Sequence, residues 1–288
     1  MADDPFPLMK HLTVKRIQEY LERRRAIILP IGSIEQHGYH LPLFTDSLVA
    51  EQIGLRLGSR LGILVAPVLA FTFSGGGLPG TINVSPAVMS LLVQDILCSL
   101  AQQGFRQFFL ILAHGGSENL AALDNALKVL LRANPLFEQG LISLLPVWKF
   151  DPQGIGWRKA FAQGDWHAGW LETSLMLALA PELVRLDQLE LDPPPLLELQ
   201  IAHPDNYLHA EKIVDDPFVA PRLSQRPDIR VGVMGYPQRA SRELGLEILE
   251  SMIEEMAGRM ESILGRAQGG YREVPFIPPP ILIREEEK

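Results

Sequence analysis

The sequence predicts an α/β protein with a mostly parallel sheet between layers of helices. Apolar runs of strand length recur along the chain, and they are nearly continuous rather than alternating, as is typical of strands covered on both faces. Stretches with helical signals lie between these runs, and such alternation is characteristic of a parallel sheet flanked by helices. The four expected strands comprise residues 26 to 31, 63 to 70, 106 to 113 and 141 to 148.

Start and stop signals mark the helices between the strands. Helices are expected over residues 13 to 24, 47 to 60, 86 to 103, 117 to 133 and, last, 241 to 265. The first begins at a threonine cap and the second at Ser47. The third has Pro86 in its first turn and stops at Gly104, the asymmetry that helix ends prefer. The fourth opens with Ser117 and Glu118 and ends before Asn134-Pro135.

The periodic pattern weakens between residues 181 and 230, which contain a proline triplet and isolated charges. We interpret this region as a long excursion over the sheet rather than as a separate domain. A single domain is therefore expected over residues 1 to 270. Residues 271 to 288, with a second proline triplet, are expected to form an extended tail.

Composition excludes several classes of protein. The 288 residues are 47% hydrophobic and 21% charged, ordinary values for a soluble globular protein. A net charge of -8 argues against a nucleic-acid partner, which would require clustered Lys and Arg. No apolar stretch is long enough to span a membrane, and the acidic N-terminus lacks the features of a signal peptide. Because Cys98 is the single cysteine, no internal disulfide is expected. A cytoplasmic location is expected as well.

Glu35-Gln36-His37-Gly38 follows the first expected strand, and Asp46 comes nine residues after His37. If the chain stays extended there, Glu35 and His37 point to the same side, because side chains alternate along extended backbone. Two carboxylates and an imidazole are ligands for Zn, Mn or Fe. The alternative for this segment alone is a polar surface loop.

Two further sets of candidate ligands follow downstream. His114-Gly115-Gly116 comes directly after the third expected strand. Farther along lie His167 and Glu172, which are five residues apart and would diverge by about 140° on one continuous helix. They converge only if His167 lies in a loop and Glu172 in the first helical turn, where the helix dipole favours a carboxylate. In α/β folds sites gather beyond the carboxyl ends of the strands, and Glu35, His37 and His114 all occupy such positions.

Other segments leave alternatives open. Gly75-Gly76-Gly77 lacks the spacing of a phosphate-binding loop, so it is either a close approach of backbone to substrate or a plain turn. Trp166 and Trp170 either wall a pocket for a flat ligand or pack between the layers. His40 is expected to support the site rather than to bind a metal directly.

Taken together, these segments resemble the creatininase (creatinine amidohydrolase) family over roughly residues 15 to 260. The matching segments are Leu29 to Gly38, His40 to Leu43 with Thr45-Asp46, Pro79-Gly80-Thr81, His114-Gly115-Gly116, Asp165 to Ser174, and Gly232 to Gly235 with Ala240-Ser241 and Gly245. The resemblance implies a three-layer α/β/α sandwich and a homo-oligomer, typically a hexamer.

The resemblance also implies two divalent metal ions per chain. They would be held by Glu35, His37, Asp46, His114 and Glu172, with Asp46 bridging the pair. The implied chemistry is hydrolysis of a non-peptide amide C–N bond, in a cyclic amide or a formamide, by a metal-bridged hydroxide. His167 would carry a proton to the leaving nitrogen. Ser74, Gly115 and Trp166 are the expected contacts to this small-molecule substrate.

The chain departs from the family pattern around His114. Leu112 and Ser117 replace asparagines of the family's usual motif, and Gly116 stands where creatininase itself carries a metal-binding Glu. Glu172 then supplies the second carboxylate, with Glu118 a less favoured substitute. Creatinine is therefore not the expected substrate. A peptidase that trims a modified peptide and a catalytically silent binding protein are the alternatives.

Overall fold

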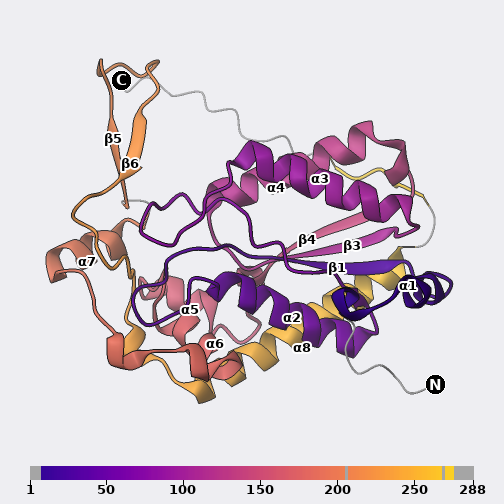
Figure 1. The fold of residues 1–288 in the computed structure, drawn as a ribbon, viewed down its shortest axis with the longest axis horizontal. Coiled ribbons are helices and arrows are strands. Elements are labelled where there is room, and N and C mark those ends of the chain that lie inside the picture. The colour runs from indigo at the N-terminus through magenta and orange to yellow at the C-terminus, as the bar shows by residue number, and fades with distance from the viewer. Residues whose placement is uncertain (1–7, 205–206, 268–269, 276–288) are drawn as a thin grey trace.

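A parallel sheet of four strands forms the centre of the computed structural model, which describes residues 8–204, 207–267 and 270–275. The strands lie in the order β2-β1-β3-β4. They comprise Ala26–Ile31 (β1), Leu64–Val65 (β2), Gln107–Leu112 (β3) and Leu141–Pro146 (β4). Helices cover both faces of the sheet, so the predicted α/β/α sandwich is confirmed (Figure 1).

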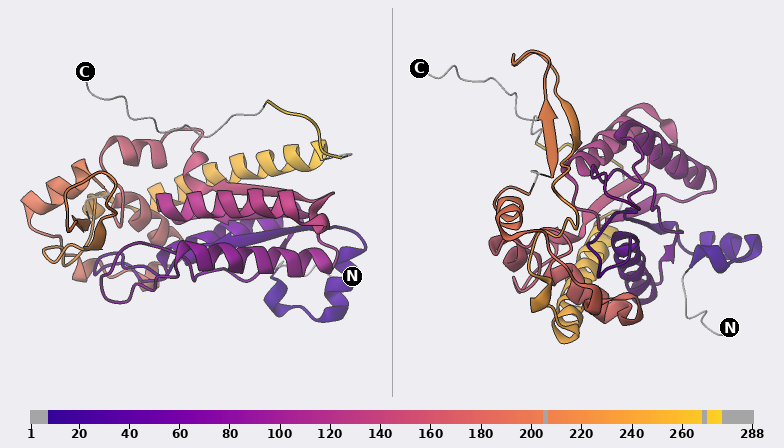
Figure 2. Two further views of the ribbon diagram at one scale, coloured as in Figure 1. Left: turned by 90° about the horizontal axis from the view of Figure 1, so that it is seen from above. Right: turned by 60° about the vertical axis from the view of Figure 1, so that its left-hand side comes forward.

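Five long helices form the two outer layers in the described part of the chain. Pro86–Gln102 (α3) and Ser117–Ala133 (α4) cover one face, whereas Thr45–Leu61 (α2), Trp170–Leu179 (α6) and Arg242–Arg266 (α8) cover the other (Figures 1 and 2). Strand β1 is fully buried, and its adjacent residues Ile27 and Ile28 belong to two separate hydrophobic cores, one on each face of the sheet. This double burial explains why the strand is apolar throughout.

Shorter elements complete the described chain. They are the helices Val14–Leu21 (α1), Trp157–Ala162 (α5) and Pro194–Ala202 (α7), the antiparallel strands Leu208–Glu211 (β5) and Arg222–Gln225 (β6), and the 3-10 turns Met9–His11, Pro135–Phe137, Val147–Lys149, Pro181–Leu183, Leu186–Gln188 and Pro237–Arg239. The hairpin of β5 and β6 projects from the body of the molecule beside α7 (Figure 1). The region 181 to 230 is thus more regular than its sequence indicates.

The prediction of a strand over residues 63 to 70 is largely wrong, because only Leu64 and Val65 form β2. The chain stays beside β1, with hydrogen bonds from the N–H of Ala66 to Ile28 and from that of Leu69 to Pro30. Ala66 and Leu69 are three residues apart but donate to residues that are two apart on β1, so one extra residue interrupts the regular ladder between them.

Helix boundaries also differ from the prediction, by one residue at several ends and by more at the start of α2 and the end of α1. Helix α2 begins at Thr45 rather than Ser47, which places Asp46 in its first turn. The hydroxyl of Ser47 does not cap the helix but donates to the carbonyl of Ser33. Helix α1 ends at Leu21, so the arginines at 23 to 25 follow the helix instead of closing it. Helix α4 has the predicted bounds.

The C-terminal tail is described only in part, since residues 276–288 lie outside the described residues. Residues 271–275 form no helix or strand, and the hydroxyl of Tyr271 lies 2.9 Å from the carbonyl oxygen of Phe137. None of the helices in the described residues has the length and apolar character that crossing a bilayer requires.

Register places the candidate ligands at one edge of the sheet. Ile31, the last residue of β1, pairs with Leu112, the last residue of β3. Because both strands run in the same direction, the segments that carry Glu35 and His114 leave the sheet side by side.

Candidate metal centre

Asp46 lies at the centre of the candidate site, and its two carboxylate oxygens face different partners. Oδ1 is 3.3 Å from Nε2 of His37, and Oδ2 is 3.0 Å from Nδ1 of His114. The carboxylates of Glu172 and Glu35 complete the two sides, since Glu172 Oε2 is 3.7 Å from His37 Nε2 and Glu35 Oε2 is 3.2 Å from His114 Nδ1. The structure thus brings together all five residues that the sequence singles out as metal ligands.

These side chains form two ligand groups that share one carboxylate. Glu35, Asp46 and His114 make one group, and His37, Asp46 and Glu172 make the other. Within each group the ligand atoms lie within 4.8 Å of one another. A carboxylate common to two groups has the arrangement required to bridge two cations.

The candidate ligands are held by hydrogen bonds to their outer atoms. Nδ1 of His37 donates to the carbonyl of Glu35 at 3.1 Å, because a carbonyl can only accept, so Nε2, which faces Asp46, is the nitrogen that a cation would occupy in place of a proton. The hydroxyl of Ser74 donates to Oε1 of Glu35 at 2.7 Å, and that of Ser33 donates to Oδ2 of Asp46 at 2.6 Å. Such bonds orient ligands before an ion arrives.

Glu172 lies in the first turn of α6, and His167 lies in the loop before it, as their spacing requires. The N–H of Ala168 donates to Oε2 of Glu172 at 2.6 Å, and Ala168 has a φ of 52°. The buried carboxylate of Asp165 accepts the N–H groups of Trp170 and Leu171 at the start of the helix. This loop conformation turns His167 back over the ligand cluster.

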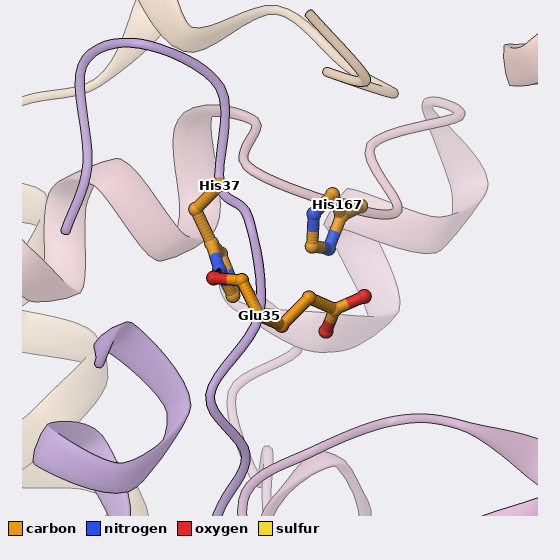
Figure 3. Close-up of side chains that lie close together, drawn as sticks. All are labelled: Glu35, His37 and His167. Carbon is orange, nitrogen blue, oxygen red and sulfur yellow. Dashed lines mark hydrogen bonds between the residues drawn. The ribbon is translucent and has the colours of Figure 1, made fainter. Parts of the chain in front are cut away.

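His167 stands beside the cluster rather than between its carboxylates. Its ring centroid is 4.4 Å from that of His37, and a third group of candidate ligand atoms joins His167 to Glu35 and His37 (Figure 3). Nε2 of His167 is 2.7 Å from the carbonyl oxygen of Gln36, which can only accept, and 3.0 Å from Nε2 of the Gln36 side chain. We assign the hydrogen to Nε2 of His167 on the shorter contact. Nδ1 is then the nitrogen that can accept a proton.

The protonation of the metal-free cluster follows from burial and opposite charges. Burial lowers the pKa of His37, but Asp46, Glu172 and Glu35 outweigh it and raise the value to about 10. Burial likewise opposes the charged form of Asp46, yet His37 and His114 hold its pKa well below the usual range. Burial raises the pKa of Glu172 to about 7. Burial also lowers the pKa of His167, which favours the neutral imidazole.

The donor set fits divalent cations. Oε2 of Glu35 and Nε2 of His37 are buried and form no hydrogen bond with a described residue, although they lie 3.2 Å from His114 and 3.3 Å from Asp46 respectively. Buried polar atoms of this kind are rare unless a ligand engages them. Carboxylate oxygens together with imidazole nitrogens are ligands that Zn, Mn and Fe accept.

A cavity of about 480 Å³ opens onto the cluster. The residues expected to contact substrate, Ser74, Gly115 and Trp166, all line it. Nε1 of Trp166 donates to the carbonyl of Ile201, so this tryptophan presents its ring to the cavity. Trp170, in contrast, is buried in the core and does not line the cavity.

The structure shows what the glycine loop at residues 75–77 and His40 contact. The glycine loop contacts the base of the β5–β6 hairpin, where Gly75 leaves no room for a Cβ beside the hydroxyl of Tyr207 and the N–H of Gly77 donates to Gln225. His40 is absent from the candidate ligand groups of the described residues, and its Nε2 lies 3.0 Å from the hydroxyl of Thr173.

Sequence reasoning missed the residues that orient the cluster. Gln36 lies within the Glu35-to-Gly38 motif, Ser33 lies two residues before it, and Asp165 begins another matching segment. Their positions can be read from the sequence, but their contacts cannot. Asn119 and Gln200 also line the cavity, and no motif in the sequence identifies them.

Comparison with known proteins shows that the creatininase family (creatinine amidohydrolase) matches residues 10–260. Creatinine amidohydrolase from Pseudomonas putida is 33% identical over 250 residues, which cover 81% of this chain and 87% of that protein. A mycofactocin precursor peptide peptidase from Mycobacterium ulcerans is 29% identical over 248 residues, covering 82% and 84% respectively.

Solved structures of creatininase share the fold. A manganese form has a TM-score of 0.68 at 27% identity, covering 91% of this chain and 99% of that chain. A zinc–zinc form of a mutant creatininase has a TM-score of 0.67 at 26% identity, with the same coverage of 91% and 99%.

Proposed function

The chain belongs to the creatininase family, and on this premise we propose that it is a hydrolase that uses two divalent metal ions to cleave a small cyclic amide or a formamide. The position of Asp46 is the observation that carries the proposal. Its Oδ1 lies 3.3 Å from His37, which groups with Glu172, and its Oδ2 lies 3.0 Å from His114, which groups with Glu35, so one carboxylate belongs to two ligand groups. Zn, Mn and Fe all suit this donor set.

Bound cations would polarise the amide carbonyl and lower the pKa of a water molecule. The chain's own contribution is to hold the ligands in place. Ser33 and Ser74 orient the carboxylates of Asp46 and Glu35, and the carbonyl of Glu35 fixes the tautomer of His37. These contacts reduce the reorganisation that binding requires.

His167 is the group proposed to move the proton. Its Nε2–H is engaged by the carbonyl of Gln36, and its Nδ1 can accept a proton from the attacking water and return it to the leaving nitrogen. The lowered pKa keeps the imidazole neutral and therefore able to act first as a base.

The test is metal stoichiometry together with hydrolysis. We expect about two ions per chain in reconstituted wild type and one or none in Asp46→Asn, which keeps the shape but lacks the charge. Asp151→Asn is the matched control, because Asp151 is also buried but accepts the N–H of Arg158 away from the cluster. Trace metal in the wild type after reconstitution would refute the proposal.

The reconstituted protein should also hydrolyse at least one compound in a panel of hydantoins, formamidopyrimidines and other small amides, and the metal-free protein should not. Two ions without hydrolysis of any small amide or peptide would instead indicate a silent binding protein. Assembly into a homo-oligomer is a further proposal from the family resemblance, which sedimentation of the purified chain would test.

Peptide trimming is the second candidate function. It is favoured by the mycofactocin precursor peptide peptidase, whose 29% identity is close to that of the creatinine amidohydrolase. Cleavage of short peptides, with no turnover of cyclic amides or formamides by the same metal-loaded preparation, would favour this candidate over the first.

A further inference from the structure

Two buried amide side chains line the cavity without a hydrogen-bond partner. Gln200 is on α7 and is 1% exposed, and Asn119 is in the first turn of α4 and is 0% exposed. Neither the oxygen nor the nitrogen of either amide forms a hydrogen bond with a described residue. Buried polar groups are nearly always paired in native proteins, so four unpaired atoms at one cavity indicate a ligand.

Another amide side chain at the same cavity, that of Gln225, does have hydrogen-bond partners. Gln225 accepts from the N–H of Gly77 at 2.9 Å and donates to the carbonyl of Tyr207 at 3.2 Å. Its amide is therefore satisfied by the chain itself. The neighbour of Gln200, Ile201, has its carbonyl bonded to Trp166 at 2.9 Å. Of these three amide side chains, those of Gln200 and Asn119 therefore lack partners, whereas that of Gln225 does not.

The charge of the cavity restricts what these amides could bind. No Lys or Arg is present among the described residues that line it, whereas Glu118 does line it in addition to the ligand carboxylates. Away from the ligand cluster, a carboxylate or phosphate would therefore meet no Lys or Arg side chain among these residues. Because an amide offers both a donor and an acceptor, its best complement is an uncharged group that presents N–H and C=O together.

An aromatic wall stands beside Gln200. The rings of Phe161 and Trp166 stack with centroids 5.0 Å apart, and those of Trp157 and Phe161 are 5.9 Å apart. Nε1 of Trp157 is buried and also forms no hydrogen bond with a described residue. Such a wall accepts a flat group and leaves its edge to hydrogen-bonding side chains.

We propose that Gln200 and Asn119 bind an uncharged amide-type group of the substrate, a carboxamide, lactam or ureide, other than the bond that is hydrolysed. This inference rests on the proposed function, because it assumes that the cavity holds the substrate of the metal centre. It makes Gln200 and Asn119 determinants of specificity, distant in sequence from the ligand motifs.

Two pairs of probes test the inference by binding to the metal-reconstituted protein. Hydantoin is compared with 2-pyrrolidone, and N-acetylglycinamide with N-propylacetamide. The first member of each pair carries a second amide-type group and the other lacks it. Ligand-observed NMR titration should show a preference of about tenfold, or 1.4 kcal/mol, for the first member of at least one pair. Preference in the ring pair points to a cyclic ureide, and preference in the linear pair points to a peptide-like substrate.

Gln200→Leu and Asn119→Leu should each reduce that preference, with metal content unchanged. Their thermal midpoints should be equal to or above that of the wild type, since each change removes an unpaired amide. The matched control Gln225→Leu should keep the preference and have a lower midpoint, because it loses two hydrogen bonds.

Equal binding within both pairs, including no binding at all, would overturn the inference, as would a preference that survives in both variants. The binding assay needs no hydrolysis. Failure of the proposed function would therefore appear separately, as absence of amide cleavage by a protein that still discriminates between the probes.

Discussion

Oγ of Ser33 donates a hydrogen bond of 2.6 Å to Oδ2 of Asp46, and both side chains are buried. The bond orients the carboxylate that serves both ligand groups. Ser33→Ala should therefore weaken metal affinity by about 10- to 100-fold, the usual effect of losing a group that orients a ligand. Metal titration of the purified variant measures this. Ser47→Ala is the control, because the Ser47 hydroxyl donates to the carbonyl of Ser33 and not to a carboxylate. Equal affinity in Ser33→Ala and wild type would contradict the role of Ser33.

His167→Ala should lower the rate about 100-fold or more while metal content stays near that of the wild type, since it removes a proton carrier beside the ligands. Elemental analysis and steady-state rates on one preparation separate the two effects. The exposed His203 provides a control substitution. Because His167 also groups with Glu35 and His37, loss of metal in the variant would identify it as a ligand instead.

Gly116→Ala should disturb the site, because a Cβ at this position would lie 2.6 Å from Nε2 of His114. We expect lower metal content or faster metal loss than in the wild type. Gly115→Ala is the matched control for metal content, since no atom lies within 4 Å of the corresponding Cβ. Equal metal retention by both variants would show that His114 can move without cost.

Creatinine should be a poor substrate. By the resemblance, creatininase carries a metal-binding Glu at the position that corresponds to Gly116 of this chain. Gly116 has no side chain with which to bind a metal or to help orient the creatinine ring. Poor orientation alone can raise a barrier by several kcal/mol, on the order of what positioning contributes. Creatinine turnover by the reconstituted protein above roughly 1 per second would place the chain with true creatininases.

The metal-free protein should lose stability as pH rises from about 6.5 to about 10. The folded pKa of His37, about 10, exceeds the unfolded value of about 6.5, because nearby carboxylates outweigh the effect of burial. The stability that this proton contributes is fully present below the unfolded pKa and is lost as pH rises through the folded pKa. The raised pKa of Glu172, about 7, acts in the same direction but at lower pH, between its usual value of 4.5 and about 7.

Thermal unfolding across this pH range is the measurement. The midpoint of the metal-free wild type should fall more steeply than that of His37→Gln, which has no titrating imidazole at the position. Saturating metal should flatten the wild-type curve, since a bound cation replaces the proton. A midpoint that is flat or rises with pH in the metal-free wild type would contradict this account.

The apolar runs and helix end signals in the sequence were sufficient to predict strands β1 and β3 and helix α4. Strands β1 and β3 are apolar because both of their faces are buried, and helix α4 has the predicted bounds. The length of β2 was overestimated because an apolar run does not reveal the extra residue that interrupts its ladder to β1 between Ala66 and Leu69. The β5–β6 hairpin was missed since its strands are short and largely exposed, so no apolar alternation marks them.

Residue types and their order along the chain were enough to identify the candidate metal ligands, because side chains that follow parallel strands emerge at one edge of the sheet. Their division into two groups around Asp46 is visible only in three dimensions, since it depends on where α2 and α6 begin relative to the sheet. The three-dimensional structure is also needed to distinguish Gln200 and Asn119, which are buried without partners, from amide side chains that are exposed to solvent. The absence of partners for their polar atoms is a property of what surrounds them in space, and a residue's sequence neighbours do not specify that.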